Sequence, residues 1–162
     1  MPIRRIVVSI PKQKLSIVDE SGAVVAVYPV STAKAGAGEQ MGSGCTPRGH
    51  HTIRAKIGAS CAEGAIFVGR RPTGELYSPA LADQFPGRDW MLARILWLRG
   101  CEPGKNRLGS VDTMRRCIYI HGTPSTEPMG IPASYGCIRM RNADIIELFD
   151  LVELNTPVLI EE

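Results

Sequence analysis

The apolar residues of this chain come in short runs separated by turn signals, and this spacing most constrains the fold. Runs of four to eight residues rich in Val and Ile are typical of β-strands. Two of them, Lys14–Asp19 and Ala23–Val30, flank Glu20-Ser21-Gly22 and predict a hairpin. The other strand-like runs are Ile3–Ile10, His51–Ile57, Ala65–Val68, Cys117–Ile120 and Val158–Ile160.

One segment near the C-terminus has a helical pattern instead. Asn142 is a preferred N-cap residue, and Asp144 would complement the helix dipole in the first turn. An apolar stripe follows, and Pro157 prevents continuation, so we expect a helix from about Ala143 to Glu153. Many strands and one late helix predict a mainly β, sandwich-like or barrel-like fold, with residues 1–162 as a single domain.

The pattern of apolar residues does not determine the structure of two segments. Residues 69–89 contain Pro72, Gly74, Pro79, Pro86 and Gly87 and are predicted to be irregular, either a lid over a site or a surface insertion. Trp90–Leu98 is apolar with a single charge, and its periodicity fits a buried strand or a short helix equally well.

Composition limits the classes of partner. Of the 162 residues 44% are hydrophobic, and the net charge is only +3, with the arginines scattered along the chain. A nucleic-acid binder usually shows a concentrated basic stripe, so we expect no nucleic acid as a partner. No run of about 18 apolar residues is present, so we expect no membrane segment.

The N-terminal apolar run is about five residues long and ends at Ser9, Ile10 and Pro11, which favours a first strand over a secretory signal. We therefore expect a cytoplasmic protein, or a periplasmic one if a leader has been removed. The five cysteines include no C-x-x-C pair, so neither a disulfide framework nor a zinc site is predicted. No metal and no cofactor are expected.

A histidine and a cysteine sixteen residues apart form the candidate catalytic pair. His121 follows the apolar run that ends at Ile120, and Cys137 follows Gly136. A cysteine attacks as its thiolate, so it needs a depressed pKa or a nearby base. The intervening residues are rich in Gly, Pro and Ser and can form a loop whose ends meet. A papain-like peptidase fits poorly, because its cysteine precedes its histidine in the chain.

The motif around this pair resembles the active-site signature of the L,D-transpeptidase (YkuD-type) catalytic domain. The matching residues are His121-Gly122-Thr123 and Ser134-x-Gly136-Cys137-Ile138-Arg139-Met140-x-Asn142. Gln13-x-Leu15, Pro29-Val30-Ser31-Thr32 and Thr46-Pro47-x-Gly49 with Ile53 match the family's usual order, so the resemblance covers nearly the whole chain. It implies a YkuD-like β-sandwich or barrel-like domain with a helix after the cysteine. Tyr135 departs from the family, which usually has a histidine there.

The resemblance also implies roles for the site residues. Cys137 would be the nucleophile, and His121 would take its proton and later return one to the leaving amine. The Gly122 carbonyl would orient the imidazole, and the N–H groups of Gly136 and Cys137 would stabilise the oxyanion.

Three further residues are candidate substrate contacts. Arg139 is either a partner of a substrate carboxylate or part of an internal salt bridge. Ser134 either holds the turn or touches substrate, and Tyr135 belongs either to the site or to the scaffold.

The implied reaction is attack on the carbonyl between the third stem residue, commonly diaminopimelate, and the terminal D-alanine of peptidoglycan tetrapeptides. Resolution of the thioester by water gives an L,D-carboxypeptidase, and resolution by an amine gives an L,D-transpeptidase that forms 3–3 cross-links or attaches other amines. A cytoplasmic enzyme would meet soluble muropeptides, so we expect a carboxypeptidase in muropeptide recycling. An inactive wall-binding module is the non-enzymatic alternative. Carbapenems are expected to acylate Cys137.

Overall fold

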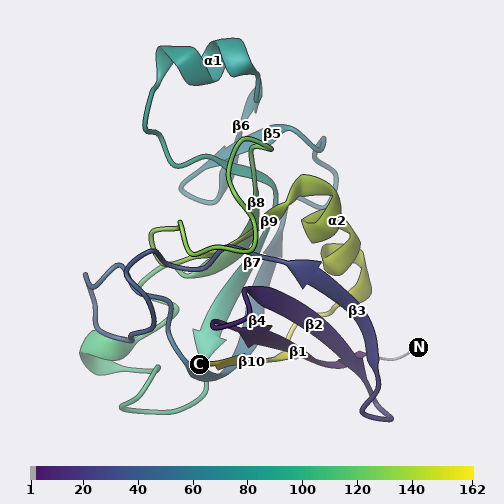
Figure 1. Ribbon diagram of the computed structural model, residues 1–162, viewed down its shortest axis with the longest axis vertical. Helices are drawn as coiled ribbons and strands as arrows, with labels where there is room; N and C mark the ends of the chain where they lie inside the picture. Colours follow the sequence, from purple (N-terminus) through teal and green to yellow (C-terminus); the bar gives the residue numbers. More distant parts are fainter. Residues whose placement is uncertain (1–2) are drawn as a thin grey trace.

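The computed structural model describes residues 3–162, which form one curled ten-stranded sheet and two α-helices (Figure 1). The helices are α1, Pro79–Gln84, and α2, Asn142–Leu151. The strands are β1 Ile3–Ser9, β2 Lys14–Asp19, β3 Val24–Pro29, β4 Gly49–Ile57, β5 Ala65–Val68, β6 Arg71–Leu76, β7 Met91–Gly100, β8 Tyr119–Thr123, β9 Ile138–Arg141 and β10 Pro157–Glu161. A 3₁₀ turn spans Gly109–Val111.

The sheet divides at β7. Its main path has the order β3-β2-β1-β10-β4-β7-β5-β6, and β8 with β9 branches from it. Ile95 of β7 pairs with Ile57 of β4 and with His121 of β8, so β4 and β8 lie on opposite edges of β7. The ten-residue β7 therefore joins the long sheet to the short β8–β9 pair that carries the candidate site.

Most of the strand predictions are confirmed. The β2–β3 hairpin forms with Lys14 opposite Pro29, and β1, β4, β5 and β10 lie where short apolar runs predict them. Residues Trp90–Leu98, which fitted either a strand or a helix, lie mostly in β7. The fold is mainly β with a helix after the candidate cysteine, as expected.

The expectation of an irregular segment over residues 69–89 is wrong in part, because this segment contains β6 and α1. Every residue of β6 is exposed, so the sequence carried no apolar alternation to reveal the strand. Ser78 caps α1: its Oγ accepts a hydrogen bond from the Leu81 N–H at 3.1 Å, and Pro79 stands at the start of the helix. Proline is favoured at this position because its missing N–H has no helical partner to lose.

The start of β8 also differs from the expectation. Cys117 has a φ of +58°, a left-handed conformation outside the range of regular strands, and β8 begins only at Tyr119. The strand then continues through Thr123, which places His121 within β8 rather than just after its end. A residue inside a paired strand is held more firmly than one in a loop.

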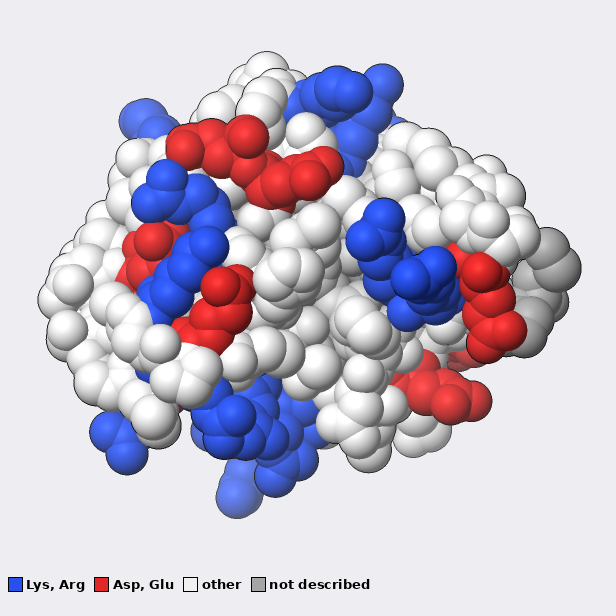
Figure 2. Space-filling model, turned by 90° about the horizontal axis from the view of Figure 1, so that it is seen from below, with Lys and Arg blue, Asp and Glu red and all other residues white. Residues whose placement is uncertain are grey.

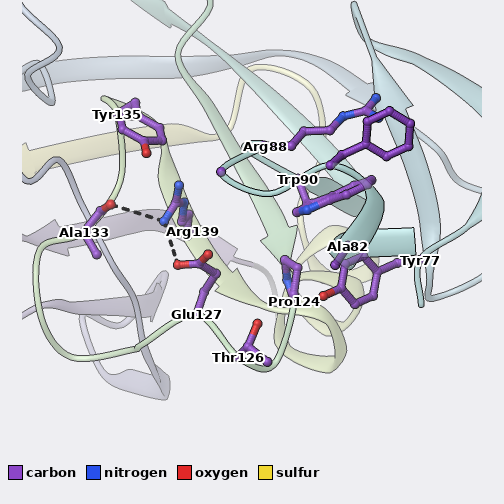
Figure 3. A pocket seen from close by; sticks show the side chains of 12 residues that line it. Tyr77, Ala82, Arg88, Trp90, Pro124, Thr126, Glu127, Ala133, Tyr135 and Arg139 are labelled. Carbon is purple, nitrogen blue, oxygen red and sulfur yellow. Dashed lines mark hydrogen bonds and ion pairs between the residues drawn. The ribbon is translucent and has the colours of Figure 1, made fainter. Parts of the chain in front are cut away.

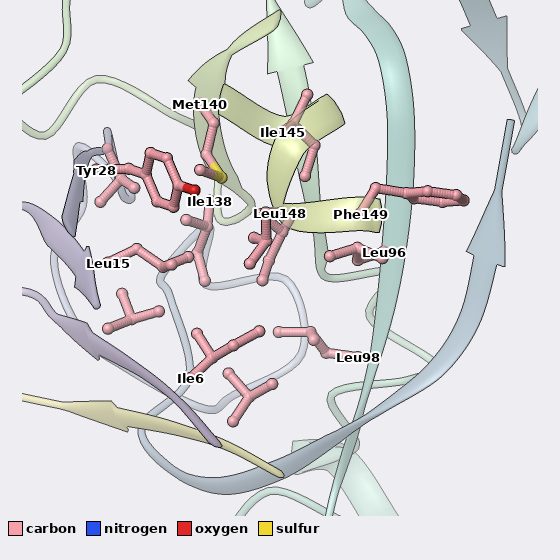
Figure 4. Close-up of a cluster of buried hydrophobic side chains, with 14 of the residues drawn as sticks. Ile6, Leu15, Tyr28, Leu96, Leu98, Ile138, Met140, Ile145, Leu148 and Phe149 are labelled. Carbon is pink, nitrogen blue, oxygen red and sulfur yellow. The ribbon is translucent and has the colours of Figure 1, made fainter. Parts of the chain in front are cut away.

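Helix α2 closes the core of the molecule. Its buried residues Ile145, Leu148 and Phe149 pack with Leu96 of β7 and with other apolar side chains of the curled sheet (Figure 4). The expectation that Asn142 caps the helix is wrong. Arg141 is the N-cap residue, no side chain caps the helix, and Asn142 is its first helical residue.

Side chains alternate between the two faces of β8 and β9, so one face contributes to the core and the other carries the candidate site residues. Ile120, Ile138 and Met140 point into the core cluster. Successive side chains of a strand point to opposite faces, so His121 and Arg139 point to the other face. These two residues are direct neighbours in the parallel β8–β9 register, and Cys137 precedes Arg139 by two residues on the same face.

Charged side chains are mixed on the surface. On the face seen in Figure 2, Lys and Arg side chains lie among Asp and Glu side chains, and no single sign covers that face. Within residues 3–162, no helix is long and apolar enough to cross a membrane.

The packing of α2 yields a stability test. Leu148 is fully buried, so Leu148→Ala should lower the free energy of unfolding by about 2–5 kcal/mol through lost burial and a residual cavity. Leu151 on the same helix is 44% exposed, and Leu151→Ala should cost less than about 1 kcal/mol. Urea unfolding monitored by circular dichroism measures both, and equal losses in the two variants would contradict this packing.

Candidate active site

His121 is fully buried and held in one tautomer. Its Nδ1 lies 2.6 Å from the carbonyl oxygen of Gly122, which can only accept a hydrogen bond, so Nδ1 carries the proton. Burial lowers the pKa of the imidazole, so the ring is neutral near pH 7. Its Nε2 keeps a lone pair and has no hydrogen-bond partner within residues 3–162. His121 is thus a fixed, unoccupied base.

Glycine is required at position 122 by the close packing around it. A Cβ built there would overlap Asn142 Oδ1 and the carbonyl oxygen of Leu92. The absence of a side chain lets β7 and the start of α2 approach the strand at the point where its carbonyl receives the imidazole N–H. The Gly122 carbonyl therefore occupies the position that the family resemblance implies for it.

Cys137 lies in the tight turn that precedes β9. Gly136 before it has a φ of +130°, a conformation that favours glycine. The half-buried Cys137 sulfur accepts a hydrogen bond from the Tyr119 N–H at 3.4 Å and donates its own to the Cys117 carbonyl at 3.5 Å. Burial raises the pKa of the thiol to about 12, so the resting group is a protonated thiol.

The two candidate catalytic side chains share a face but are not hydrogen-bonded to each other. In the described chain, the sulfur donates to Cys117 and no hydrogen bond joins it to His121 Nε2. The resting site therefore holds a neutral pair, and proton transfer must accompany attack on substrate.

Ser134 holds the turn that presents the nucleophile. Its Oγ donates a hydrogen bond to the Cys137 carbonyl at 2.5 Å and accepts one from the Gly136 N–H at 3.2 Å. The Gly136 N–H, an expected oxyanion donor, is therefore engaged in this structure. The Cys137 N–H makes no backbone or side-chain hydrogen bond in the described residues, which leaves it free for an oxyanion.

Arg139 forms the internal salt bridge that was one of its two expected roles. Its guanidinium lies 2.8 Å from Asp89 and 3.2 Å from Glu127, and it also donates to the Ala133 carbonyl at 3.2 Å (Figure 3). The side chain is buried, whereas Tyr135 beside it is 67% exposed. The guanidinium carbon lies 5.4 Å from the centroid of the Tyr135 ring, within cation–π range.

A cavity of about 240 Å³ adjoins this ion-pair cluster (Figure 3). One wall is aromatic and is formed by Tyr77, Phe85 and Trp90, which belong to the segments around α1. Arg139, Glu127 and Tyr135 form the opposite wall, whereas Cys137 and His121 do not line this cavity. The segment 69–89 therefore contributes one wall of a cavity beside the site.

Sequence reasoning missed three charged residues around the site. Asp89 and Glu127, the partners of Arg139, lie 50 and 12 residues from it in the chain. Arg116 donates hydrogen bonds to the carbonyls of Cys45 at 2.6 Å and Gly38 at 3.2 Å, and so holds their loop against the Gly136 turn. The Arg115-Arg116 pair was visible in the sequence, but no motif indicated its contacts.

Metal ligands are not gathered at this site. Within residues 3–162, no group of three or more His, Cys, Asp or Glu side chains is placed to hold a metal ion.

The fold and the paired thiol and imidazole define a cysteine acyl-transfer domain, and comparison with known proteins identifies its family. The profile of the YkuD family, described as the L,D-transpeptidase catalytic domain, matches residues 3–160. The chain therefore belongs to the YkuD L,D-transpeptidase catalytic domain family.

Several similar proteins are named L,D-transpeptidases. YqjB of Bacillus subtilis (strain 168), a protein assigned to the L,D-transpeptidases, is 43% identical over 47 residues, which are 29% of this chain and 27% of YqjB. Among solved structures, the L,D-transpeptidase of Xylanimonas cellulosilytica has a TM-score of 0.61 at 22% identity and covers 99% of this chain. LdtMt1, solved in complex with imipenem, has a TM-score of 0.57 at 19% identity and covers 98%.

These structural likenesses establish the fold. This chain spans 60% of the length of the Xylanimonas chain and 59% of the LdtMt1 chain.

The protonation state of Cys137 can be tested by thiol alkylation. Because burial raises its pKa to about 12, its labelling by iodoacetamide at pH 7 should be more than about tenfold slower than that of the exposed Cys101. The thiolate fraction rises tenfold per pH unit below the pKa, so labelling should accelerate about 100-fold from pH 7 to pH 9. Peptide mapping by mass spectrometry separates the cysteines. Faster labelling of Cys137 than of Cys101 at pH 7 would show a preformed thiolate instead.

Proposed function

We propose that this domain carries out cysteine-dependent acyl transfer on the L,D peptide bond of peptidoglycan tetrapeptide stems and releases the terminal D-alanine. The observation that carries the proposal is the buried His121, fixed by Gly122 with an unoccupied Nε2 on the face that presents the Cys137 thiol. Membership in the YkuD family supports the substrate class.

The first half of the reaction forms a thioester. As the sulfur of Cys137 attacks the carbonyl carbon, its proton passes to His121 Nε2, and the imidazolium is stabilised by its hydrogen bond to the Gly122 carbonyl. The Cys137 N–H donates a hydrogen bond to the substrate oxygen as negative charge develops on it. The C–N bond then breaks, and His121 returns the proton to the departing amine of D-alanine.

We propose water as the acyl acceptor, which makes the domain an L,D-carboxypeptidase that trims tetrapeptides to tripeptides. The neutral His121 can deprotonate a water molecule that attacks the thioester and then return the proton to the leaving sulfur. The cavity of about 240 Å³ beside the site is smaller than the ~300–1,000 Å³ typical of ligand pockets, which favours one short peptide segment. The proposal includes soluble muropeptides in the cytoplasm as substrates, which cell fractionation of the tagged protein would test.

Transpeptidation is the second candidate, and a separate observation favours it. Another cavity, of about 270 Å³, shares Pro124 and Glu127 with the first and is a second place for the amine end of an acceptor stem. An amine seated there would resolve the thioester to a 3–3 cross-link or to another amide.

Product analysis distinguishes these reactions. A purified disaccharide tetrapeptide incubated with the protein should lose one alanine and form tripeptide without dimer, as measured by mass spectrometry. A 3–3 dimer as the main product would reject the carboxypeptidase proposal in favour of transpeptidation. Absence of any product, together with binding to purified wall, would favour an inactive wall-binding module.

The nucleophile can be tested with a carbapenem, because the sulfur that attacks the peptide carbonyl should also open the β-lactam ring. We expect one covalent adduct on Cys137 in the intact protein, and no adduct and no turnover in Cys137→Ala. The matched control Cys101→Ala removes an exposed thiol and should keep both the covalent adduct and the turnover.

The role of His121 as the base is tested by the rate of carbapenem acylation. His121→Asn should slow acylation by about 10²–10⁴-fold, the usual contribution of a positioned base. In the wild-type protein the midpoint of the decline in acylation rate with falling pH should lie below that of a solvent-exposed imidazole, because burial lowers the His121 pKa and the neutral ring is the base. Turnover that survives in Cys137→Ala would refute the assignment of the nucleophile.

A further inference from the structure

Thr46 contacts the turn that presents the nucleophile, although the Thr46-Pro47-x-Gly49 motif has no role in the reaction described above. The residue is fully buried and lies 90 residues before Gly136 in the chain. Its Oγ1 lies 2.9 Å from the Gly136 carbonyl oxygen. The motif therefore reaches the candidate site through this hydrogen bond.

The direction of this hydrogen bond follows from the other partner of the hydroxyl. The Ala33 N–H donates to Thr46 Oγ1 at 3.0 Å. The Gly136 carbonyl oxygen can only accept, so the single hydroxyl hydrogen of Thr46 is donated to it. Thr46 thus joins the backbone of Ala33 to the backbone of Gly136.

The Gly136 carbonyl and the Cys137 N–H belong to the same peptide unit. This unit is trans and close to planar, so its C=O and N–H bonds point in opposite directions. Holding the carbonyl oxygen against Thr46 therefore directs the Cys137 N–H away from Thr46. That N–H makes no hydrogen bond in the described residues, and it is the donor left free for an oxyanion.

Ser134 does not supply this restraint. Its Oγ bonds the Gly136 N–H and the Cys137 carbonyl, which belong to the two neighbouring peptide units. Gly136 has a φ of +130° and no Cβ, so the unit between them can rotate with little steric resistance. A rotated unit would present its carbonyl oxygen, with a partial negative charge, where the oxyanion develops. Within residues 3–162, the Thr46 hydroxyl is the only hydrogen-bond partner of this unit.

The position of the Thr46 hydroxyl is fixed by the backbone around it. The Thr46 N–H donates to the Gly36 carbonyl at 3.0 Å, and the Thr46 carbonyl accepts from the Gly38 N–H at 2.9 Å. Arg116 donates to the preceding carbonyl, that of Cys45, at 2.6 Å. All polar groups of Thr46 are paired, so its hydroxyl is a rigid support for the turn.

We propose that Thr46 is a positioning residue for the oxyanion. By holding the Gly136 carbonyl, it aims the Cys137 N–H at the substrate oxygen on which negative charge develops during acylation. Thr46 acts through the peptide unit between Gly136 and Cys137 and not on the sulfur. The inference rests on the proposed function, because it concerns the acyl-transfer step of that reaction.

Two reactions of the same sulfur separate this role from general support of the fold. Acylation of Cys137 by a carbapenem places negative charge on a carbonyl oxygen and should need the aimed N–H. Alkylation by iodoacetamide displaces iodide at a saturated carbon, forms no oxyanion and depends on the thiolate alone. Mass spectrometry of the intact protein gives the acylation rate, and peptide mapping at about pH 9 gives the alkylation rate of Cys137.

Thr46→Val keeps the shape of the side chain and removes the hydroxyl. We expect its acylation to slow by about 10–100-fold, somewhat less than the ~10²–10³ cost of losing an oxyanion donor, and its Cys137 alkylation to stay within about twofold of wild type. Thr46→Ser restores the hydroxyl and should acylate within about threefold of the wild-type rate. The matched control Thr156→Val removes another largely buried hydroxyl that accepts a backbone N–H, that of Glu153 at 3.1 Å, and should change neither rate.

Equal slowing of both reactions in Thr46→Val, or no slowing of acylation, would overturn the positioning role. A crystal structure of the acylated wild-type protein gives a test that needs no variant. In it the adduct carbonyl oxygen should accept a hydrogen bond from the Cys137 N–H while the Gly136 carbonyl still accepts one from Thr46. A rotated peptide unit in that structure would overturn the proposal.

The outcomes also separate this proposal from the proposed function. If the carbapenem acylates Cys137 but the protein releases no D-alanine from tetrapeptides, the proposed substrate fails and the acylation rates still decide the role of Thr46. If the carbapenem does not acylate the wild-type protein, the proposed nucleophile fails, and amide residual dipolar couplings measured by NMR decide the role of Thr46. The Cys137 N–H bond should change direction in Thr46→Val and keep it in Thr46→Ser, and an unchanged direction in Thr46→Val would overturn the proposal.

Discussion

The hydrogen bond from His121 Nδ1 to the Gly122 carbonyl is the interaction on which the candidate site depends. It fixes the tautomer and therefore leaves Nε2 as the only ring atom able to accept a proton. It is possible because residue 122 has no side chain at a place where β7 and α2 approach closely. A backbone carbonyl carries no full charge, so this partner orients the ring and raises the pKa of the imidazole less than a carboxylate would, and burial still lowers that pKa overall.

Burial explains why the resting pair is neutral. Removal from water disfavours both charged forms, so the same environment raises the pKa of the Cys137 thiol and lowers that of the His121 imidazole. Arg139 opposes only the first of these effects, and its charge is balanced by Asp89 and Glu127. A neutral thiol is protected from adventitious oxidation and alkylation, and its reactivity appears when a carbonyl group arrives for it to attack.

The sequence predicted what short-range patterns encode. Alternating apolar residues indicated the strands, the spacing of Leu148 and its apolar neighbours indicated α2, and the order of His121 and Cys137 indicated the family. It did not reveal the partners of Arg139, because pairing across 50 residues of chain leaves no periodic trace. The sequence did not predict the exposed β6 either, because a strand with no buried face shows no alternation of apolar and polar residues.

Tyr135 is the departure from the family motif, which usually has a histidine at this position. Its side chain is largely exposed, and its ring lies within cation–π range of the Arg139 guanidinium. The turn itself is held by Ser134, which bonds the backbone on both sides of the nucleophile. Position 135 therefore carries neither the base nor the support of the turn. A tyrosine there offers its aromatic ring to the Arg139 guanidinium.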